Sequence, residues 1–468
     1  MDHQPSSDLP VKIGLEIHVQ LRTKSKLFCS CSADYRSASA NSNICPICTG
    51  QPGSKPKFVN KSAVENAIKM ALALNSNVNL NNAISMQRKH YFYPDLPSGY
   101  QRTSKPIATG GSLKDVTFTE MHIEEDPGQF ELRDGTVDYN RSGVPLVEIV
   151  TEPEFKDPKH AREFLEELLA ILDYLSAASI QPGSLRVDAN ISVAGNNRVE
   201  VKNINSFKGV FTALTFESAR QKNLVKNNLP VARETRHFDE SRGTTSSLRR
   251  KEDAQDYRYF SDPDVSYLIL SESQIQEIKK TLPELPSEKR NRFCKVYGLI
   301  EEEAFAITLE KYMADCYEQV AKSVDSKIAG NFFRGILKKQ LNYRGLSMVE
   351  SELTSSILIK IIKMMTSAQI TEKVAEQLLI AVLDLKADPQ EYAEKNNLLG
   401  IQEQSTLNEI IDKAISENPQ AVKDYLSGKQ ESINFISGIV MKLTRGKADP
   451  KHLQLTLKEK FDLIKKSG

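Results

Sequence analysis

Residues 13–22 alternate without a break between apolar and other side chains, in the order Ile-Gly-Leu-Glu-Ile-His-Val-Gln-Leu-Arg. This two-residue period predicts a β-strand with one face against a hydrophobic core. Glu16, His18 and Gln20 then share the opposite face. A carboxylate and an imidazole two residues apart on a rigid strand can bind a metal ion or transfer a proton. A half-buried strand with a solvated face explains the same pattern, so this segment alone leaves both interpretations open.

Strand patterns and turn signals continue to about residue 270. In residues 184–193, apolar side chains alternate with a polar set that includes Arg186 and Asp188. Sheets with one covered face and one polar face are typically antiparallel. One helix interrupts the strands, because Asp157-Pro158 supplies an N-cap and a first helical residue, and leucines then recur at helical spacing as far as Leu175.

The pattern changes near residue 285. Beyond it, strand alternation disappears and helical periodicity continues to the end, with helix starts such as Asn418-Pro419. A chain of 468 residues is also too long for one ordinary core. We therefore expect an α+β protein with an antiparallel-sheet domain over residues 1–285, an all-helical domain over 286–400 and a tail domain over 401–468.

The composition is that of an ordinary globular protein, with 40% hydrophobic and 26% charged residues. No apolar run is long enough to cross a bilayer, and residues 1–8 do not resemble a secretory signal. We therefore expect a cytoplasmic location and no membrane partner.

Basic residues gather at the C-terminus, although the net charge of +1 neither requires nor excludes a nucleic-acid partner. Residues 439–468 contain eight Lys or Arg, among them Lys442, Arg445 and Lys447, against three Asp or Glu. A basic end on a nearly neutral protein fits contact with a phosphate backbone. A solvated helix face explains the same charges equally well.

Four of the six cysteines form two close pairs, Cys29 with Cys31 and Cys45 with Cys48, separated by thirteen residues. Two such pairs can place four thiolates tetrahedrally around zinc. In a protein expected in the cytoplasm, this spacing indicates a metal site more often than a redox centre. A closed four-sulfur site would be structural rather than catalytic.

Two carboxylates occupy strand positions that the pattern would give to apolar side chains. Glu125 follows Met121 and Ile123 in the alternation, and Glu148 lies inside an apolar strand. An unpaired buried charge is costly, so each carboxylate needs a metal ion or a cationic side chain. Together with His18 they would form a site suited to Mg²⁺ or Mn²⁺. The alternative is a salt bridge to a cation: Lys89, Arg141 or Arg186.

Aromatic and basic side chains are interleaved in residues 88–101, which begin Arg-Lys-His-Tyr-Phe-Tyr. Flat side chains beside basic ones can stack on a base and contact phosphate. Aromatic residues at this density are also common in cores, so both interpretations stay open. The sequence has no P-loop motif GxxxxGK[ST], so nucleotide chemistry of that kind is excluded.

Several long motifs in one order closely resemble the GatB family, a component of the aspartyl/glutamyl-tRNA amidotransferases. The motifs are residues 14–20, 29–48, 88–95, 122–126, 140–148, 183–190, 202–207, 234–239 and 256–260, with 418–425 and 438–447 in the tail. The resemblance covers essentially the whole chain. Residues 98–104 depart from the bacterial pattern and look more like archaeal versions.

The resemblance implies a cradle domain related to glutamine synthetase, a helical domain and a YqeY-like tail that helps to hold tRNA. It implies a heterotrimer with an amidase subunit, GatA, and a small subunit, GatC. The substrates would be misacylated Asp-tRNA(Asn) or Glu-tRNA(Gln). ATP would phosphorylate the side-chain carboxyl, and ammonia channelled from GatA would replace the phosphate. This sequence has no amidase nucleophile motif of its own.

The resemblance also assigns residues to roles. The Mg²⁺ ligands would be His18, Glu125 and Glu148, with Glu16 adjoining, and the structural Zn²⁺ ligands would be Cys29, Cys31, Cys45 and Cys48. The catalytic groups would be Glu125, Lys89 and Arg186, and the tRNA contacts Lys442, Arg445 and Lys447. Residues that contact the adenine of ATP are not assigned.

Two other functions stay open. One is a non-catalytic RNA-binding protein with a zinc knuckle, against which the carboxylates embedded in strands argue. The other is a stand-alone Mg²⁺-dependent ligase for free amino acids, against which the helical tail and the missing ammonia source argue. The sequence does not determine whether Asp-tRNA(Asn), Glu-tRNA(Gln) or both are used.

Overall fold

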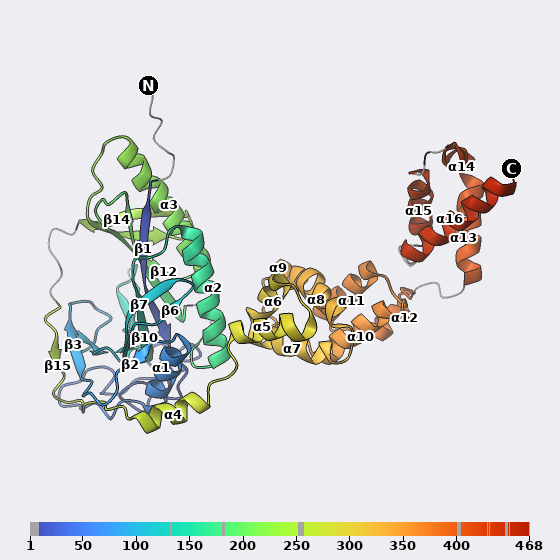
Figure 1. Ribbon diagram of the computed structural model, residues 1–468. Helices are drawn as coiled ribbons and strands as arrows, with labels where there is room; N and C mark the ends of the chain where they lie inside the picture. Colours follow the sequence, from blue (N-terminus) through green and yellow to red (C-terminus); the bar gives the residue numbers. More distant parts are fainter. Residues whose placement is uncertain are drawn as a thin grey trace. The chain divides into compact units, whose positions relative to one another are not determined.

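The computed structural model divides into two compact units, Met1–Pro286 and Ser287–Gly468 (Figure 1). The residues that it describes are 9–131, 133–179, 183–250, 257–399, 404–427, 429, 431–444, 448 and 450–467. The first unit contains a large sheet with helices, and the second is helical throughout its described part. This arrangement confirms the predicted α+β class.

The sheet of the first unit has 13 strands, and its main path runs β14-β13-β12-β11-β1-β10-β7-β4-β3-β15. Along this path the described pairings are antiparallel except for β12 with β13. The path strands are β1 Val11–Gln20, β3 Met86–His90, β4 Tyr100–Ser104, β7 Val116–Glu125, β10 Pro145–Thr151, β11 Leu185–Val193, β12 Val199–Ile204, β13 Glu234–Asp239, β14 Thr244–Arg250 and β15 Phe260–Ser261. The short strands are β2 Asn77–Val78, β5 Ala108–Thr109 and β6 Ser112–Leu113, with a separate hairpin of β8 Gln129–Glu131 and β9 Thr136–Asp138.

Register brings distant polar residues together at the centre of the sheet. His18 of β1 lies opposite Glu148 of β10 on one side and Arg186 of β11 on the other. Glu148 in turn lies opposite His122 of β7. Directly opposed residues of an antiparallel pair share a face, so these side chains project from the same face of the sheet.

Three helices pack on the other face of this sheet, α1 Lys61–Ala73, α2 Pro158–Leu175 and α3 Phe207–Lys226 (Figure 1). The intervening positions of β1, such as Ile17 and Val19, are fully buried among helix residues. Burying a side chain of this size contributes about 1.5–3 kcal/mol. Helix α2 begins as the sequence predicts, since the Asp157 side chain accepts a 2.8 Å hydrogen bond from the His160 amide. Helix α4, Glu272–Lys280, follows the sheet.

The second unit consists of helices. They are α5 Pro286–Tyr297, α6 Glu301–Thr308, α7 Lys311–Ala321, α8 Ser326–Phe332, the π-helix Phe333–Leu337, α9 Lys338–Arg344, α10 Ser355–Thr366, α11 Glu372–Leu385, α12 Pro389–Lys395, α13 Gln404–Glu417, α14 Pro419–Leu426, α15 Ser432–Leu443 and α16 Pro450–Ser467. Residues of α13, α15 and α16 share a core cluster that includes Ile411, Ile436 and Phe461. In the described part of the chain, no helix has the length and apolar character needed to cross a membrane.

Candidate active site

One imidazole and two carboxylates converge on the polar face of the sheet. His18 Nε2 lies 3.6 Å from Glu124 Oε2 and 3.6 Å from Glu148 Oε1. The three residues come from the central strands β1, β7 and β10. Their ligand atoms all lie within 4.8 Å of one another, so they can contact one ion. We call His18, Glu124 and Glu148 the central trio.

The central trio fits a divalent cation of the Mg²⁺ class. Neighbouring ligands of octahedral Mg²⁺ lie about 3 Å apart, so separations of 3.6 Å need only small side-chain rotations. Glu124 Oε2 accepts a hydrogen bond from Gln101 Nε2 at 3.1 Å, but Glu124 Oε1 is buried without a hydrogen-bond partner. A buried carboxylate oxygen without a partner is costly, and a bound cation would supply the missing interaction.

Electrostatics around the trio favour the same ligand. Burial, together with the neighbouring Glu124 charge, raises the pKa of Glu148 well above its ordinary value. Burial lowers the pKa of His18, which keeps the imidazole neutral and available as a ligand. A divalent cation would relieve the repulsion between the two carboxylates.

The structure corrects one member of the predicted ligand set, because Glu124 and not Glu125 joins His18 and Glu148. Successive side chains of β7 point to opposite faces, so Glu125 projects away from the trio. Glu125 Oε2 lies 3.3 Å from Arg102 Nη1. Arg102 Nε in turn donates a 2.7 Å hydrogen bond to Asp262 Oδ2. The salt-bridge alternative therefore holds for Glu125, although with Arg102 rather than with the cations considered from sequence.

Lys89 lies beside the central trio. Burial acts to lower its pKa, but the carboxylates of Glu124 and Glu148 outweigh burial and raise it, so the ammonium stays charged. Its Nζ lies 5.0 Å from the centre of the Tyr257 ring. A fixed positive charge at this place can neutralise an anionic group that approaches the trio.

Arg186 borders His18 across the β1–β11 pair and is held by a buried carboxylate. It donates a short hydrogen bond to Asp126 Oδ1, and Arg141 Nε lies 3.5 Å from the same oxygen. Gln20 Nε2 donates to the other oxygen, Asp126 Oδ2, at 2.6 Å. Arg186 and Arg141 are thus committed to Asp126, and sequence reasoning did not single out this anchor.

Glu16 belongs to a second acidic group rather than to the central trio. Its ligand atom and those of Asp188 and Glu200 lie within 4.8 Å of one another. Lys202 Nζ lies 3.1 Å from Asp188 Oδ2 and 3.0 Å from Glu200 Oε1. The predicted polar face of residues 184–193 contained Asp188, but only the β1–β11 register shows that it lies opposite Glu16.

A cavity of about 250 Å³ opens beside Glu16. Its lining combines apolar side chains such as Val150 and Pro153 with the exposed cations Lys12 and Arg198. Pockets that mix apolar walls with a few polar groups are typical of small-molecule sites.

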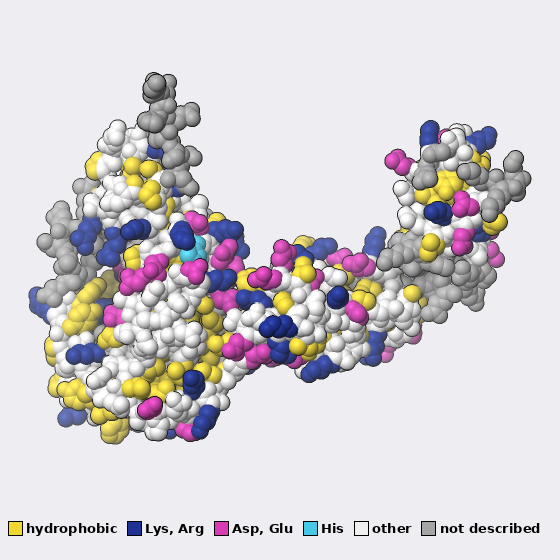
Figure 2. Space-filling model, viewed as in Figure 1, with side chains coloured by type: hydrophobic (Ala, Val, Ile, Leu, Met, Phe, Trp, Pro, Cys, Tyr) yellow, Lys and Arg dark blue, Asp and Glu magenta, His cyan; other side chains and the backbone are white. Residues whose placement is uncertain are grey.

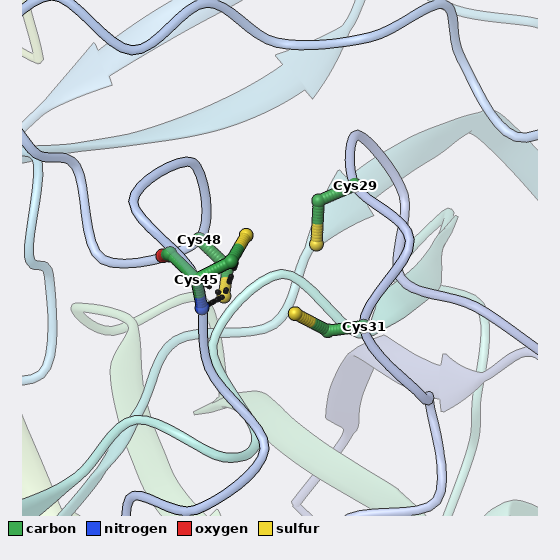
Figure 3. Close-up of side chains that lie close together, drawn as sticks. All are labelled: Cys29, Cys31, Cys45 and Cys48. Atoms are coloured by element: carbon green, nitrogen blue, oxygen red, sulfur yellow. Dashed lines mark hydrogen bonds between the residues drawn. The ribbon is translucent and has the colours of Figure 1, made fainter.

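The four cysteines predicted to bind zinc face one another from two loops (Figure 3). Cys45 Sγ and Cys48 Sγ lie 3.9 Å apart. Tetrahedral zinc with thiolate ligands requires sulfur separations of about 3.8 Å. The sulfur atoms of all four residues lie within 4.8 Å of one another, so the donor set and its spacing fit a structural zinc ion.

The aromatic segment forms a surface at the edge of the sheet. His90 stacks on Phe260 of β15 with ring centres 5.0 Å apart, and Arg88 lies over the Tyr100 ring. Phe92 is 98% exposed and Tyr93 45%. Hydrophobic and basic side chains lie next to each other at the edge that carries β3 and β15 (Figure 2). An exposed aromatic with nearby cations suits stacking on a base.

Of the basic residues predicted to contact tRNA, Lys442 is exposed at the end of α15. Arg445 and Lys447 lie outside the described residues.

Comparison with known families agrees with this geometry. The profile of the GatB/GatE catalytic domain matches residues 11–276, which contain both acidic groups and the four cysteines. The chain belongs to the GatB family. A second profile, described as a GatB domain, matches residues 315–461. The predicted membership is confirmed, and the chain is one component of an amidotransferase, a ligase.

Three relatives, each named as the GatB-type component of an aspartyl/glutamyl-tRNA(Asn/Gln) amidotransferase, illustrate the similarity. The protein of Methanothermobacter thermautotrophicus is 47% identical over 96% of this chain and 100% of its own length. That of Methanobrevibacter smithii is 47% identical over 96% of this chain and 99% of its own. That of Methanocaldococcus jannaschii is 45% identical over 97% and 98%. The family implies the use of ATP.

Proposed function

We propose that this GatB chain phosphorylates the side-chain carboxyl of misacylated Asp-tRNA(Asn), Glu-tRNA(Gln) or both, and then amidates it. The observation that carries the proposal is the central trio beside Lys89, on the polar face of a sheet that matches the GatB/GatE catalytic domain. The names of the full-length relatives support the choice of substrates.

The chemistry explains why such a site needs cations. A carboxylate is a poor acyl donor, because its leaving group would be oxide. When a carboxylate oxygen attacks the γ-phosphorus of ATP, ADP leaves and an acyl phosphate forms. Ammonia then attacks the acyl carbon, inorganic phosphate leaves as the C–O bond breaks, and one proton is released. Two anions must approach each other in the first step, so positive charge has to be supplied there.

The residues of the chain divide this work. His18, Glu124 and Glu148 would hold Mg²⁺, which would offset phosphate charge when bound. Lys89 keeps its proton and can pair with a carboxylate or phosphate oxygen. Arg186, oriented by Asp126, adds a second fixed positive charge on the neighbouring strand. Glu125 acts at a distance by fixing Arg102 and is not proposed as a ligand.

We place the nucleotide beside Glu16. The cavity there has apolar walls for a base and exposed Lys12 and Arg198 for phosphate or ribose oxygens. The group of Glu16, Asp188 and Glu200 could hold a second cation between this cavity and the central trio. Shared binding of phosphate by two cations is a general solution to in-line displacement.

Ammonia and tRNA would come from outside this chain. An acyl phosphate survives only where water is excluded, so ammonia is best delivered by a closed route. The lack of an amidase motif supports a glutaminase partner, GatA, in a complex with GatC. Phe92 and the cations around β3 would hold the acceptor end of the tRNA, and Lys442, Arg445 and Lys447 would contact its backbone. The location would be cytoplasmic, with the pool of charged tRNA.

The deciding experiment is ATP hydrolysis by the purified trimer with each misacylated tRNA in turn. We expect hydrolysis to require Asp-tRNA(Asn) or Glu-tRNA(Gln) and not the correctly charged or uncharged tRNA. Hydrolysis driven by free aspartate or glutamate would favour a stand-alone ligase. Tight tRNA binding without any ATP hydrolysis would favour a non-catalytic RNA-binding protein.

A further inference from the structure

Lys26 is an unusual residue, because a lysine side chain is buried beside the four cysteines. It is only 1% exposed. Its Nζ donates hydrogen bonds to the backbone oxygen of Asn43 at 3.0 Å and of Tyr139 at 3.3 Å. Its third contact is Cys48 Sγ, at 3.4 Å. These three acceptors use the full donor capacity of an ammonium group.

No carboxylate pairs with this ammonium among the ion pairs of the described residues. Carbonyl oxygens satisfy its hydrogen bonds but supply no countercharge, and a buried cation without one is strongly destabilising. Four thiolates around one Zn²⁺ keep a net double negative charge. The sulfur atom that Lys26 contacts belongs to that group, so the missing countercharge lies within hydrogen-bonding distance.

We propose that Lys26 is the charge partner of a zinc–tetrathiolate centre and joins that centre to the loop that leads into the catalytic strand β10. The inference goes beyond the amidation chemistry, since it concerns what stabilises the metal and what the metal in turn stabilises. It depends on zinc as the occupant of the four cysteines.

The loop of residues 139–143 supports the second half of this proposal. Besides the Tyr139 contact to Lys26, Ser142 Oγ donates a 2.9 Å hydrogen bond to the backbone oxygen of Cys48. The Leu27 amide donates to the Gly143 oxygen at 2.8 Å. Gly143 has φ +83°, and a Cβ atom there would lie 3.5 Å from the Cys48 Cβ. The loop therefore packs directly against the cysteines.

The same loop reaches the active site at its other end. Arg141 lies beside Asp126, the residue that orients Arg186, and the Gly143 amide donates to the Asp126 oxygen at 2.9 Å. Residue 145 then begins β10, which carries Glu148. A loosened metal centre would thus release the loop that positions these groups, which makes Lys26 a positioning residue.

The test uses the full-length, zinc-loaded chain and the variant Lys26→Met, which keeps the apolar stem and removes the charge. We expect zinc to transfer to a chromogenic chelator about tenfold to a hundredfold faster than from the wild type, the range found for outer-shell partners of metal ligands. Lys24→Met is the matched control, because Lys24 lies on the same loop but is exposed. Equal transfer rates for Lys26→Met and the wild type would overturn the proposal.

A second measurement separates charge from packing. The thermal midpoint of Lys26→Met is compared with that of the wild type, with zinc bound and after zinc has been stripped. We expect a clear loss with zinc and a smaller loss, or a gain, without it, because the stripped wild type buries an ammonium beside protonated thiols. Equal losses in both states would mean that Lys26 acts by packing alone and would overturn the proposal.

If Lys26→Met does not fold, Lys26→Gln serves in its place, since it retains a donor for the two carbonyl oxygens while removing the charge. The same faster transfer of zinc is expected. A wild-type chain that binds no zinc at all would overturn the metal assignment and this inference with it, while leaving the proposed amidation intact.

Discussion

Two neighbouring carboxylates on β7, Glu124 and Glu125, have different surroundings because successive strand residues face opposite sides of the sheet. Glu124 joins His18 and Glu148, whereas Glu125 contacts Arg102. We expect Glu124→Gln to lower transamidation by at least about a hundredfold, since even outer-shell changes at metal sites cost about 10–100-fold. Glu125→Gln should cost about tenfold or less. Single-turnover amidation with saturating tRNA measures both.

The comparison of these two variants is its own control, because they remove the same charge one residue apart. Binding of misacylated tRNA should persist in each. If Glu125→Gln were the more damaging variant, the central trio would not be the ion-binding group.

Asp262 gives a prediction of pH dependence. Burial would raise its pKa, but hydrogen bonds from Arg88 at 2.9 Å and Arg102 at 2.7 Å hold that pKa below its ordinary value. Its contribution to folding stability is therefore full above about pH 4, the unfolded-state pKa, and is lost as the pH falls through the folded-state pKa. Asp262→Asn should lower the free energy of unfolding by about 3 kcal/mol at pH 7, because it breaks a buried ion pair.

Circular dichroism melts at pH 7 and pH 3 test this dependence. The difference between Asp262→Asn and the wild type should shrink at the lower pH. Asp264→Asn is the control, since Asp264 pairs with Arg88 at the surface, with its side chain 37% exposed, and should change stability little. A difference that is the same at both pH values would contradict the assignment.

Phe92 tests the proposed contact with the acceptor end of tRNA. A 98% exposed phenylalanine contributes little to folding, so Phe92→Ala should leave the thermal midpoint unchanged. If Phe92 stacks on a base, its removal should cost about 1–3 kcal/mol of binding. This appears as a raised KM for misacylated tRNA. Phe58→Ala, another exposed phenylalanine, should leave that KM unchanged.

At the scale of secondary structure, alternation and capping in the sequence predicted particular elements well. The strand expected at 13–22 is Val11–Gln20, and the helix expected from Pro158 to Leu175 has those bounds. Both signals are local, since a strand alternates with period two and a helix begins at an N-cap. The cysteine pairs were found for the same reason, because their spacing alone brings them together.

Pairing between distant segments could not be predicted in this way. Glu16 lies opposite Asp188, and His18 opposite Glu148, across long stretches of sequence. Alternation did place Glu125 on the core-facing side of β7, but it did not show which face holds the metal ligands. Central strands are buried on both faces, so a carboxylate on either side looks misplaced in sequence. Glu124 was therefore missed, and so was the second acidic group.

The loop between β11 and β12 carries Arg198 to the cavity beside Glu16. If this cavity holds ATP, Arg198→Ala should raise the KM for ATP by about fivefold, the value of about 1 kcal/mol expected for an exposed charge. The kcat should change little, because Arg198 lies away from the central trio. Arg233→Ala, an exposed arginine before β13, is the control. An unchanged KM for ATP in Arg198→Ala would place the nucleotide elsewhere.

At the scale of the whole molecule, the first unit carries the candidate chemistry, and α13–α16 have a core of their own. The predicted boundary near residue 400 stays a prediction, as does the relation of the cradle to glutamine synthetase. A chain ending at residue 399, assembled with its partners, should bind tRNA more weakly. Loss of phosphate contacts should also flatten the dependence of affinity on salt.

Amidation by this truncated chain with free ammonium at saturating tRNA separates binding from chemistry. We expect a raised KM for tRNA and a kcat within a few-fold of the full-length value. A collapse of kcat at saturation would show that the tail contributes to the reaction itself.

Strand β1 also acts as a ruler. Glu16 and His18 are two residues apart on it, which fixes the two acidic groups about 7 Å apart through covalent backbone. A gauge of that kind cannot stretch by the single methylene that distinguishes a glutamyl from an aspartyl side chain. An enzyme that serves both amino acids must therefore take up the difference where the end of the tRNA is seated, and selectivity between them should be altered by changing that seat rather than the ions.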